Sequence, residues 1–237
     1  MSLVVAGSRS SLDYYLVRAE LGDGEPAAKA EAVVVEEFTR QTDFTTVGLD
    51  SAGWTPSGAG WWSSASLGRS MRTDATLLAR VVPTGRGVAE SVYRELGGGQ
   101  LPDEAVLRTY FRDHHPIPTA PPLRLGPAQP PAGFHERRVY RVLFAKDLQE
   151  EQLVSIRAAW STPTGGTPGS VAAGHRLRGG DQFAWELRRV GRGLAWCLDL
   201  TALLRGAASD EVGPILSELT HTMRGRGLIP VTTERFA

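Results

Sequence analysis

Apolar residues follow two different periods in the C-terminal half of the chain, and the order of these periods predicts its fold. Alternation at every second residue, typical of β-strands, occurs in residues 139–145, 183–187 and 194–200. Helical spacing occurs in residues 148–160, where Leu153, Ile156 and Trp160 share one stripe, and again after residue 210. A final apolar segment covers residues 228–236. The predicted order is β-α-β-β-α-β, a ferredoxin-like unit with an antiparallel sheet and two helices on one face.

Local start and stop signals support these elements. Asp147 is predicted to cap the first helix, with Glu150 completing a capping box. Residues 191–193, Gly-Arg-Gly, favour a hairpin between the two middle strands. Pro214 is tolerated only in a first helical turn, so the second helix should begin within residues 210–213. Pro230 favours an edge position for the last strand, or a place among the first residues of that strand.

The N-terminal half predicts a second α+β unit, so the fold class of the chain is α+β. Strands are expected at residues 12–21, 32–38 and 45–49, and residues 77–82 favour a strand or a short buried helix. Helices are expected from Ser63 or Ser64 to Met71, around Val88, Val92 and Leu96, and after Pro102.

A proline-rich segment separates the two halves. Residues 116–133 hold seven of the fifteen prolines, which favours an extended spacer. We therefore expect an N-terminal unit over residues 1–115, a linker over 116–133 and the ferredoxin-like unit over 134–237; an ordered strap across one domain is the alternative. Residues 161–180 hold six glycines and two prolines, which predicts a mobile loop.

Charge and composition exclude some classes of function. The chain has 26 basic and 26 acidic residues, so no global field attracts nucleic acid or an anionic membrane. Arginine outnumbers lysine 24 to 2, a bias that is typical of proteins encoded by a high-GC bacterial genome. No signal peptide or long apolar run is present, and we expect a cytoplasmic protein. The single cysteine, Cys197, is predicted to be a small buried hydrophobe.

No catalytic or cofactor motif stands out. The phosphate-binding loop, the dinucleotide-binding glycine pattern and the Gly-x-Ser-x-Gly elbow are all missing. His114, His115, His135 and Glu136 could converge on a metal, but zinc-ligand spacings are absent, so neither a metal nor a cofactor is predicted.

Basic residues suggest one possible binding function. His135, Arg137, Arg138, Arg176 and Arg178 could form an anion-binding wall. The strand signature of an RNA-recognition motif is absent, so nucleic acid is an unlikely ligand. The corresponding functional hypothesis is a small-molecule-binding protein or enzyme with an anion-binding pocket between the two halves.

Three tryptophans in a glycine-rich loop give the preferred hypothesis. Trp54, Trp61 and Trp62 lie within ten residues of one another. Adjacent residues point to different sides of a strand, so one of Trp61 and Trp62 should be partly exposed. Exposed tryptophan is enriched at protein interfaces. We therefore expect a non-enzymatic accessory or interaction protein that binds a protein partner or a second copy of itself.

Overall fold

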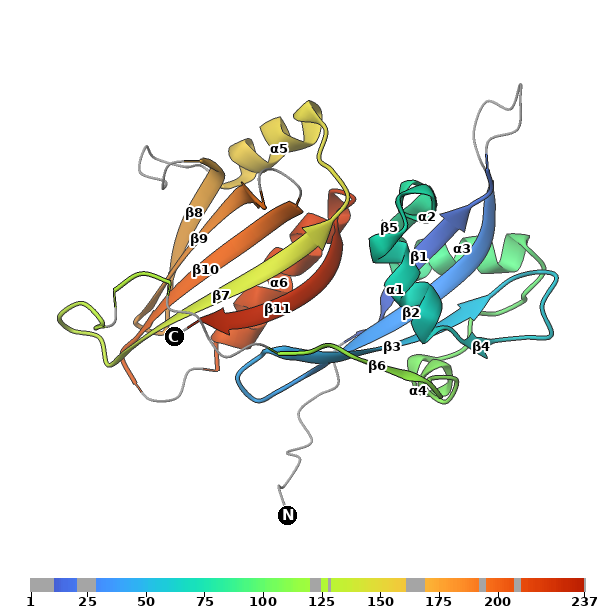
Figure 1. Cartoon of the computed structure of the whole chain (residues 1–237), viewed down its shortest axis with the longest axis horizontal. Helices are drawn as coiled ribbons and strands as arrows, with labels where there is room; N and C mark the ends of the chain where they lie inside the picture. Colours follow the sequence, from blue (N-terminus) through green and yellow to red (C-terminus); the bar gives the residue numbers. More distant parts are fainter. Residues whose placement is uncertain are drawn as a thin grey trace, which may run out of the picture. The chain divides into compact units, whose positions relative to one another are not determined.

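The described part of the chain has a mixed α+β fold with two antiparallel sheets. The structure is a computed structural model that describes residues 11–20, 29–119, 125–127, 129–160, 169–191, 195–206 and 210–236. These residues form six helices and eleven strands in two compact units (Figure 1). Unit 1 contains Met1–Thr39 and Gly48–Pro116; unit 2 contains Arg40–Val47 and Ile117–Ala237.

Unit 1 is built on a sheet with strand order β4-β3-β2-β1-β5, in which β6 also pairs with β3. Its elements, in chain order, are β1 (Asp13–Arg18), β2 (Ala30–Arg40), β3 (Thr46–Trp54), β4 (Trp62–Ser63), α1 (Ala65–Thr73), α2 (Ala75–Arg80), β5 (Val81–Thr84), α3 (Arg86–Glu95), α4 (Glu104–Arg108) and β6 (His114–Pro116).

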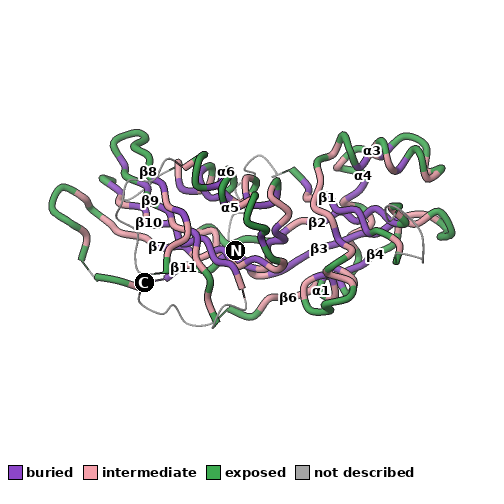
Figure 2. The backbone as a smooth tube through the Cα atoms, turned by 90° about the horizontal axis from the view of Figure 1, so that it is seen from above, coloured by how far each residue is buried: buried purple, intermediate pink, exposed green. Residues whose placement is uncertain are grey.

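Helices pack on both faces of the unit 1 sheet. On one face, α3 and α4 contribute Tyr93 and Leu107 to a core that includes Trp54. On the other face, Arg72 of α1 bonds to Glu36 of β2. Buried positions concentrate on the strands of this sheet, as Figure 2 shows.

The Glu36–Arg72 ion pair is enclosed in unit 1. The two side chains are 0% and 6% exposed, and Arg72 Nη2 lies 2.7 Å from Glu36 Oε2. Burial alone would lower the pKa of Arg72, but the charge and hydrogen bonds of Glu36 raise it above the usual value. Gly68 allows the approach, because a Cβ there would lie 2.7 Å from Glu36 Oε1. The buried charge of Glu36, on the α1 side of β2, is therefore compensated by Arg72.

Unit 2 is built on a sheet with strand order β11-β7-β10-β9-β8. Its elements are β7 (Glu136–Ala145), α5 (Glu150–Trp160), β8 (Ser170–Arg178), β9 (Asp181–Val190), β10 (Ala195–Leu204), α6 (Val212–Gly225) and β11 (Ile229–Phe236). Ile156 of α5 and Ile215 of α6 belong to one core cluster with Phe144 and Leu198, so both helices cover the same face.

Several expectations for this unit are confirmed. The two middle strands are adjacent and antiparallel, with Leu198 opposite Leu187 and Leu200 opposite Trp185. The second helix begins at Val212, with Pro214 in its first turn, and β11 is an edge strand. Part of the hairpin connection, residues 192–194, lies outside the described residues.

The predicted loop at residues 161–180 is partly wrong. Residues 170–178 form β8, which pairs with β9 along its length and adds a fifth strand to the sheet. The apolar signal is weak because the inward positions carry Ala172 and Gly174, both buried. The ring of Trp185 takes the space there: a Cβ on Gly174 would lie 2.7 Å from its Cε2. Residues 161–168 lie outside the described residues.

The predicted cap of α5 is also wrong. The helix starts at Glu150, and the side chain of Gln152 accepts a hydrogen bond from Gln149 N at 2.7 Å. Asp147 instead accepts from Trp196 Nε1 at 2.7 Å and pairs with Arg189. The pKa of Asp147 is lowered, chiefly by the hydrogen bond from Arg189. Asp147 also accepts a local bond from Leu148 N at 2.9 Å, before the helix begins, and its other contacts are tertiary.

In unit 1 the helix around Val88, Val92 and Leu96 is confirmed, and Val92 and Leu96 pack against the core. The structure buries Ala89 and Tyr93, whereas Val88 is 55% exposed. Residues 77–82 divide between α2 and β5. Ser64 precedes α1, yet its hydroxyl bonds to Ser51 Oγ at 2.8 Å instead of capping the helix.

The tip of the β2–β3 hairpin, Arg40–Val47, belongs to unit 2. Phe44 adopts a left-handed φ of 70°, which is rare for a bulky residue. Its ring meets Tyr140 edge-on at 6.2 Å and packs over Gly213, where a Cβ would lie 2.7 Å from Phe44 Cε1. Thr46 Oγ1 accepts a buried hydrogen bond from Thr233 N at 3.0 Å. Packing thus stabilises a turn conformation that the sequence does not favour.

The proline-rich segment is described only in part. Pro116 closes β6, where it pairs with Gly48 of β3. The next residue, Ile117, donates its N–H to the carbonyl oxygen of Val47 at 2.9 Å. Residues 120–124 and 128 of the predicted linker lie outside the described residues.

The longest helix, α6, has 14 residues, and none of the helices in the described ranges has the length and apolar character needed to cross a bilayer.

The position of β8 gives a prediction about proteolysis. Arg176 bonds to Glu218 of α6 at 2.7 and 2.9 Å, and Arg178 pairs with Glu211 at 2.8 Å. Cleavage requires an extended, locally unfolded backbone, whereas this strand is paired with β9. We expect trypsin to cut after Arg176 slowly, at a rate that rises in step with urea-induced unfolding. Mass spectrometry of timed digests measures this, and rapid cutting in the absence of urea would contradict it.

Candidate functional site

An aromatic cluster in unit 1 positions the predicted tryptophans. Trp54, at the end of β3, is 7% exposed and meets Tyr93 of α3 edge-on at 4.5 Å. Trp61 stacks on Tyr93 at 5.7 Å and on Tyr110 at 6.3 Å. Trp54 and Trp61 therefore stabilise the fold around the loop, and Trp54 is too buried to contact another molecule.

Trp62 is the exposed member of the three. It lies on the short edge strand β4 and is 37% exposed, so one of the adjacent tryptophans is partly exposed, as predicted. It pairs with Gly53, and a Cβ on that glycine would lie 2.7 Å from Trp62 Cζ2. The indole ring of Trp62 thus packs on the backbone of β3 at Gly53. An aromatic side chain that covers a glycine in this way stabilises the pairing of the two strands.

Two serines fix the strand that carries Trp62. Ser63 Oγ accepts hydrogen bonds from Asp113 N at 2.9 Å and from Arg112 N at 3.2 Å. Ser64 N donates to Ser51 O at 2.8 Å. These bonds tie β4 to β3 and to the segment after α4, so the exposed indole is presented from an ordered backbone.

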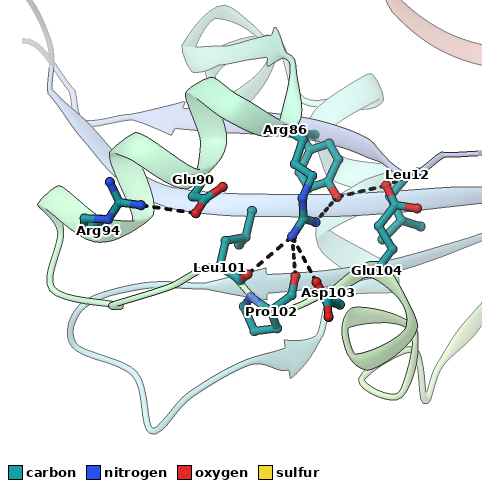
Figure 3. Close-up of polar contacts among 9 residues, drawn as sticks. Leu12, Arg86, Glu90, Arg94, Leu101, Pro102, Asp103 and Glu104 are labelled. Atoms are coloured by element: carbon teal, nitrogen blue, oxygen red, sulfur yellow. Dashed lines mark hydrogen bonds and ion pairs between the residues drawn. The ribbon is translucent and has the colours of Figure 1, made fainter.

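A polar network holds the segment that leads to Tyr110. Figure 3 shows Arg86 of α3 directed at the chain just before α4, with its guanidinium 2.9 Å from Pro102 O. Arg86 Nη1 also donates to Tyr14 OH at 2.8 Å, and Tyr14 OH donates to Glu104 Oε1 at 3.1 Å. The main chain of Leu12 donates to the same carboxylate oxygen.

The hydrogen bonds of this network have a structural role. Burial, the largest cause, raises the pKa of Tyr14 to about 12, so the phenol stays protonated near neutral pH and remains a donor to Glu104. Arg108 completes the network by donating to both oxygens of Glu37, at 2.8 and 2.9 Å. The network links β1, β2, α3 and α4, and it contains no activated nucleophile or base.

The structure does not bring the five predicted anion-binding residues together. His135 lies just before β7 and Arg137 and Arg138 lie at its start, whereas Arg176 and Arg178 lie on β8, which is three strands farther along the sheet order. Adjacent strands are about 4.8 Å apart, so the two groups are separated by roughly 14 Å. Arg137 and Arg138 are consecutive strand residues and point to opposite faces.

Each predicted arginine already has a partner. Arg138 bonds to Glu136 at 2.7 Å, which lowers the pKa of that glutamate. Arg137 donates to Leu125 O at 2.8 Å. Arg176, through its hydrogen bonds, lowers the pKa of Glu218. Arg138 and Arg176 therefore have acidic partners, whereas Arg137 bonds to a backbone carbonyl oxygen, and anion binding by these residues stays a prediction.

The sheet face of unit 2 that is opposite α5 and α6 carries an ion cluster that sequence reasoning missed. Asp199, 5% exposed, accepts hydrogen bonds from Arg141 at 2.7 and 2.9 Å and from Arg188 at 2.9 and 2.7 Å. Cys197 lies beside it, fully buried, and burial, the largest cause, raises the pKa of its thiol to about 11. The thiol is therefore a small buried group, in agreement with the sequence-based prediction.

Within the described ranges, no group of three or more His, Cys, Asp or Glu side chains is placed to hold a metal ion. His114 of β6 instead forms a hydrogen bond with Asp50 of β3, at 2.9 Å. No family model, curated protein or solved structure matches the chain.

Proposed function

We propose that this protein is a non-enzymatic interaction protein that binds a protein partner at the edge strand β4. The supporting observation is Trp62, a large aromatic side chain that is 37% exposed at the edge of a sheet. Tryptophan is the residue most often found at the energetic centre of protein interfaces. Its position on β4 also leaves an outer edge to which another strand or loop can add.

The surroundings of Trp62 support this role. The indole lies against Gly53, and its strand is fixed by the hydrogen bonds of Ser63. A side chain held in place before binding loses less conformational entropy when a partner arrives. Trp54 and Trp61 stabilise the loop around this site. The proposed partner-binding residues are therefore reduced from three tryptophans to Trp62 alone.

Site-specific photo-crosslinking tests the proposal. Trp62 is replaced by p-benzoylphenylalanine in the producing cells, and Val88, a 55% exposed residue on α3 of the same unit, is the matched control position. We expect one dominant protein adduct from position 62 and none of the same mass from position 88. A partner that is a second copy gives an adduct of twice the chain mass.

Binding measurements with the purified partner complete the test. Truncation of an interface tryptophan typically costs 2 kcal/mol or more, so W62A should weaken affinity by about 30-fold. V88A should change it by less than about twofold. Adducts that are absent at position 62, or identical at both positions, would contradict the proposal.

The finer fold assignment belongs with this proposal. Without β8, the strand order of unit 2 is β11-β7-β10-β9, which is fourth, first, third and second along the chain. This is the order of a ferredoxin-like β-α-β-β-α-β unit. We infer that unit 2 is such a unit with one added edge strand, so its function depends on surface residues, because the fold serves many activities.

A further inference from the structure

The tip of the β2–β3 hairpin, residues 40–47, packs on α6 and β11 through a buried hydrogen bond and an aromatic ring. Thr46 Oγ1 accepts the N–H of Thr233, on the edge strand β11, at 3.0 Å. The ring of Phe44 meets Tyr140 edge-on at 6.2 Å and lies over Gly213 of α6. Phe44 is only partly buried, and it lines a hollow that is partly open to solvent.

The backbone of Phe44 opposes this docked position. Its φ of 70° lies in the left-handed region, where a bulky side chain costs free energy. Such a conformation persists only where the surrounding contacts impose it, and it is typical of clamps and switch regions. When the ring leaves Gly213, the backbone is free to return to an unstrained conformation.

The tip and β11 each have bonds that do not depend on the other. Within the tip, Gln41 N donates to Thr45 O at 2.9 Å, and Thr45 N donates to Asp43 Oδ1 at 3.0 Å. Strand β11 is paired with β7 from Ile229 to Phe236. Separation of the two therefore leaves both the turn and the sheet of unit 2 intact.

From these features we propose that the hairpin tip is a clasp that undocks reversibly from α6 and β11 while the sheet of unit 2 stays folded. Burial of the Phe44 ring favours the docked state, and release of the strain at Phe44 favours the undocked state. The docked tip covers the outer edge of β11 at Thr233, and covering is one way in which proteins protect an edge strand. Undocking exposes this edge and the Phe44 ring together.

Hydrogen exchange in the full chain, followed by NMR, tests the proposal. The amide of Thr233 reports undocking, because its N–H donates to Thr46 of the tip. The amide of Leu198, a fully buried residue of the central strand β10, reports unfolding of the sheet. After correction for intrinsic rates, Thr233 should exchange at least about 100-fold faster than Leu198. Equal rates would overturn the proposal, because the tip would then leave only when the unit unfolds.

A glycine pair on α6 separates undocking from a general loss of stability. G213A places a Cβ 2.7 Å from Phe44 Cε1, so it should raise the exchange rate of Thr233 about tenfold and leave that of Leu198 unchanged. G225A is the matched control, since a Cβ at Gly225 meets open space, and both rates should stay within about twofold. Acceleration of Thr233 and Leu198 to the same extent in G213A would overturn the proposal.

Two variants at position 44 separate the strain from the ring. F44A and F44G both remove the ring, but glycine adopts a positive φ at no steric cost. Thr233 should therefore exchange about threefold more slowly in F44G than in F44A. Equal rates in the two variants would overturn the role of strain in the clasp.

Discussion

Replacing Glu36 with alanine is expected to lower the free energy of unfolding by about 3 to 5 kcal/mol, because it leaves a buried cation without its partner. Arg72 is 6% exposed and donates to both oxygens of Glu36, at 3.0 and 2.7 Å. Arg72 also donates to Gly68 O, and that bond carries no compensating charge. Urea unfolding followed by circular dichroism measures the change from the transition midpoint and slope.

The same strand supplies a control for this experiment. Glu31 of β2 pairs with Arg80, but its side chain is 46% exposed, so E31A should cost less than about 1 kcal/mol. The double variant E36L/R72M should recover much of the loss, because apolar residues of similar volume often replace a buried ion pair without penalty. A loss below about 1 kcal/mol in E36A would show that Arg72 finds water or another partner.

Replacing Trp185 with alanine is expected to destabilise unit 2 by about 3 to 5 kcal/mol, the usual cost of removing a large buried aromatic residue. Trp185 is 7% exposed, meets Trp160 edge-on at 6.1 Å and fills the space over Gly174. L177A on the neighbouring strand is the control, since Leu177 is 70% exposed and should matter by less than about 0.5 kcal/mol.

A size exchange tests the contact between Trp185 and Gly174 directly. G174L alone should be destabilising, because an added Cβ would lie 2.7 Å from the indole. In W185A the same leucine enters the vacated volume, so the double variant should be more stable than W185A. Additive losses from the two changes would mean that the two positions are not coupled.

The success of sequence reasoning in unit 2 depended on side-chain size. Strands β9 and β10 were predictable because Trp185, Leu187, Leu198 and Leu200 are large and alternate strictly. Strand β8 has the same alternation of buried and less buried positions in its first half, but Ala172 and Gly174 fill the inward ones. A hydrophobicity pattern is detected through large apolar residues. A strand with small inward residues is therefore missed when the large side chains that fill its side of the core belong to the neighbouring strand.

At the candidate site, too, only part of the arrangement could be predicted from the sequence. The exposure of one of two adjacent tryptophans follows from strand geometry and was predictable. The roles of Tyr93 and Tyr110 were not, because these residues join Trp61 only through the tertiary fold. The helix with Tyr93 was predicted from Val88, Val92 and Leu96, yet Val88 is 55% exposed and Tyr93 makes the contact with Trp54. Tertiary packing thus overrode the local pattern.

The hairpin tip in unit 2 has a consequence for synthesis on the ribosome. Phe44 is made 169 residues before Gly213 (213 − 44), the glycine on which its ring rests. At about 5 to 20 residues per second, roughly 10 to 30 s pass between the two. During that interval the hairpin of the first unit can form while its aromatic tip has no binding surface. The nascent chain therefore exposes a phenylalanine that a chaperone can recognise until α6 emerges.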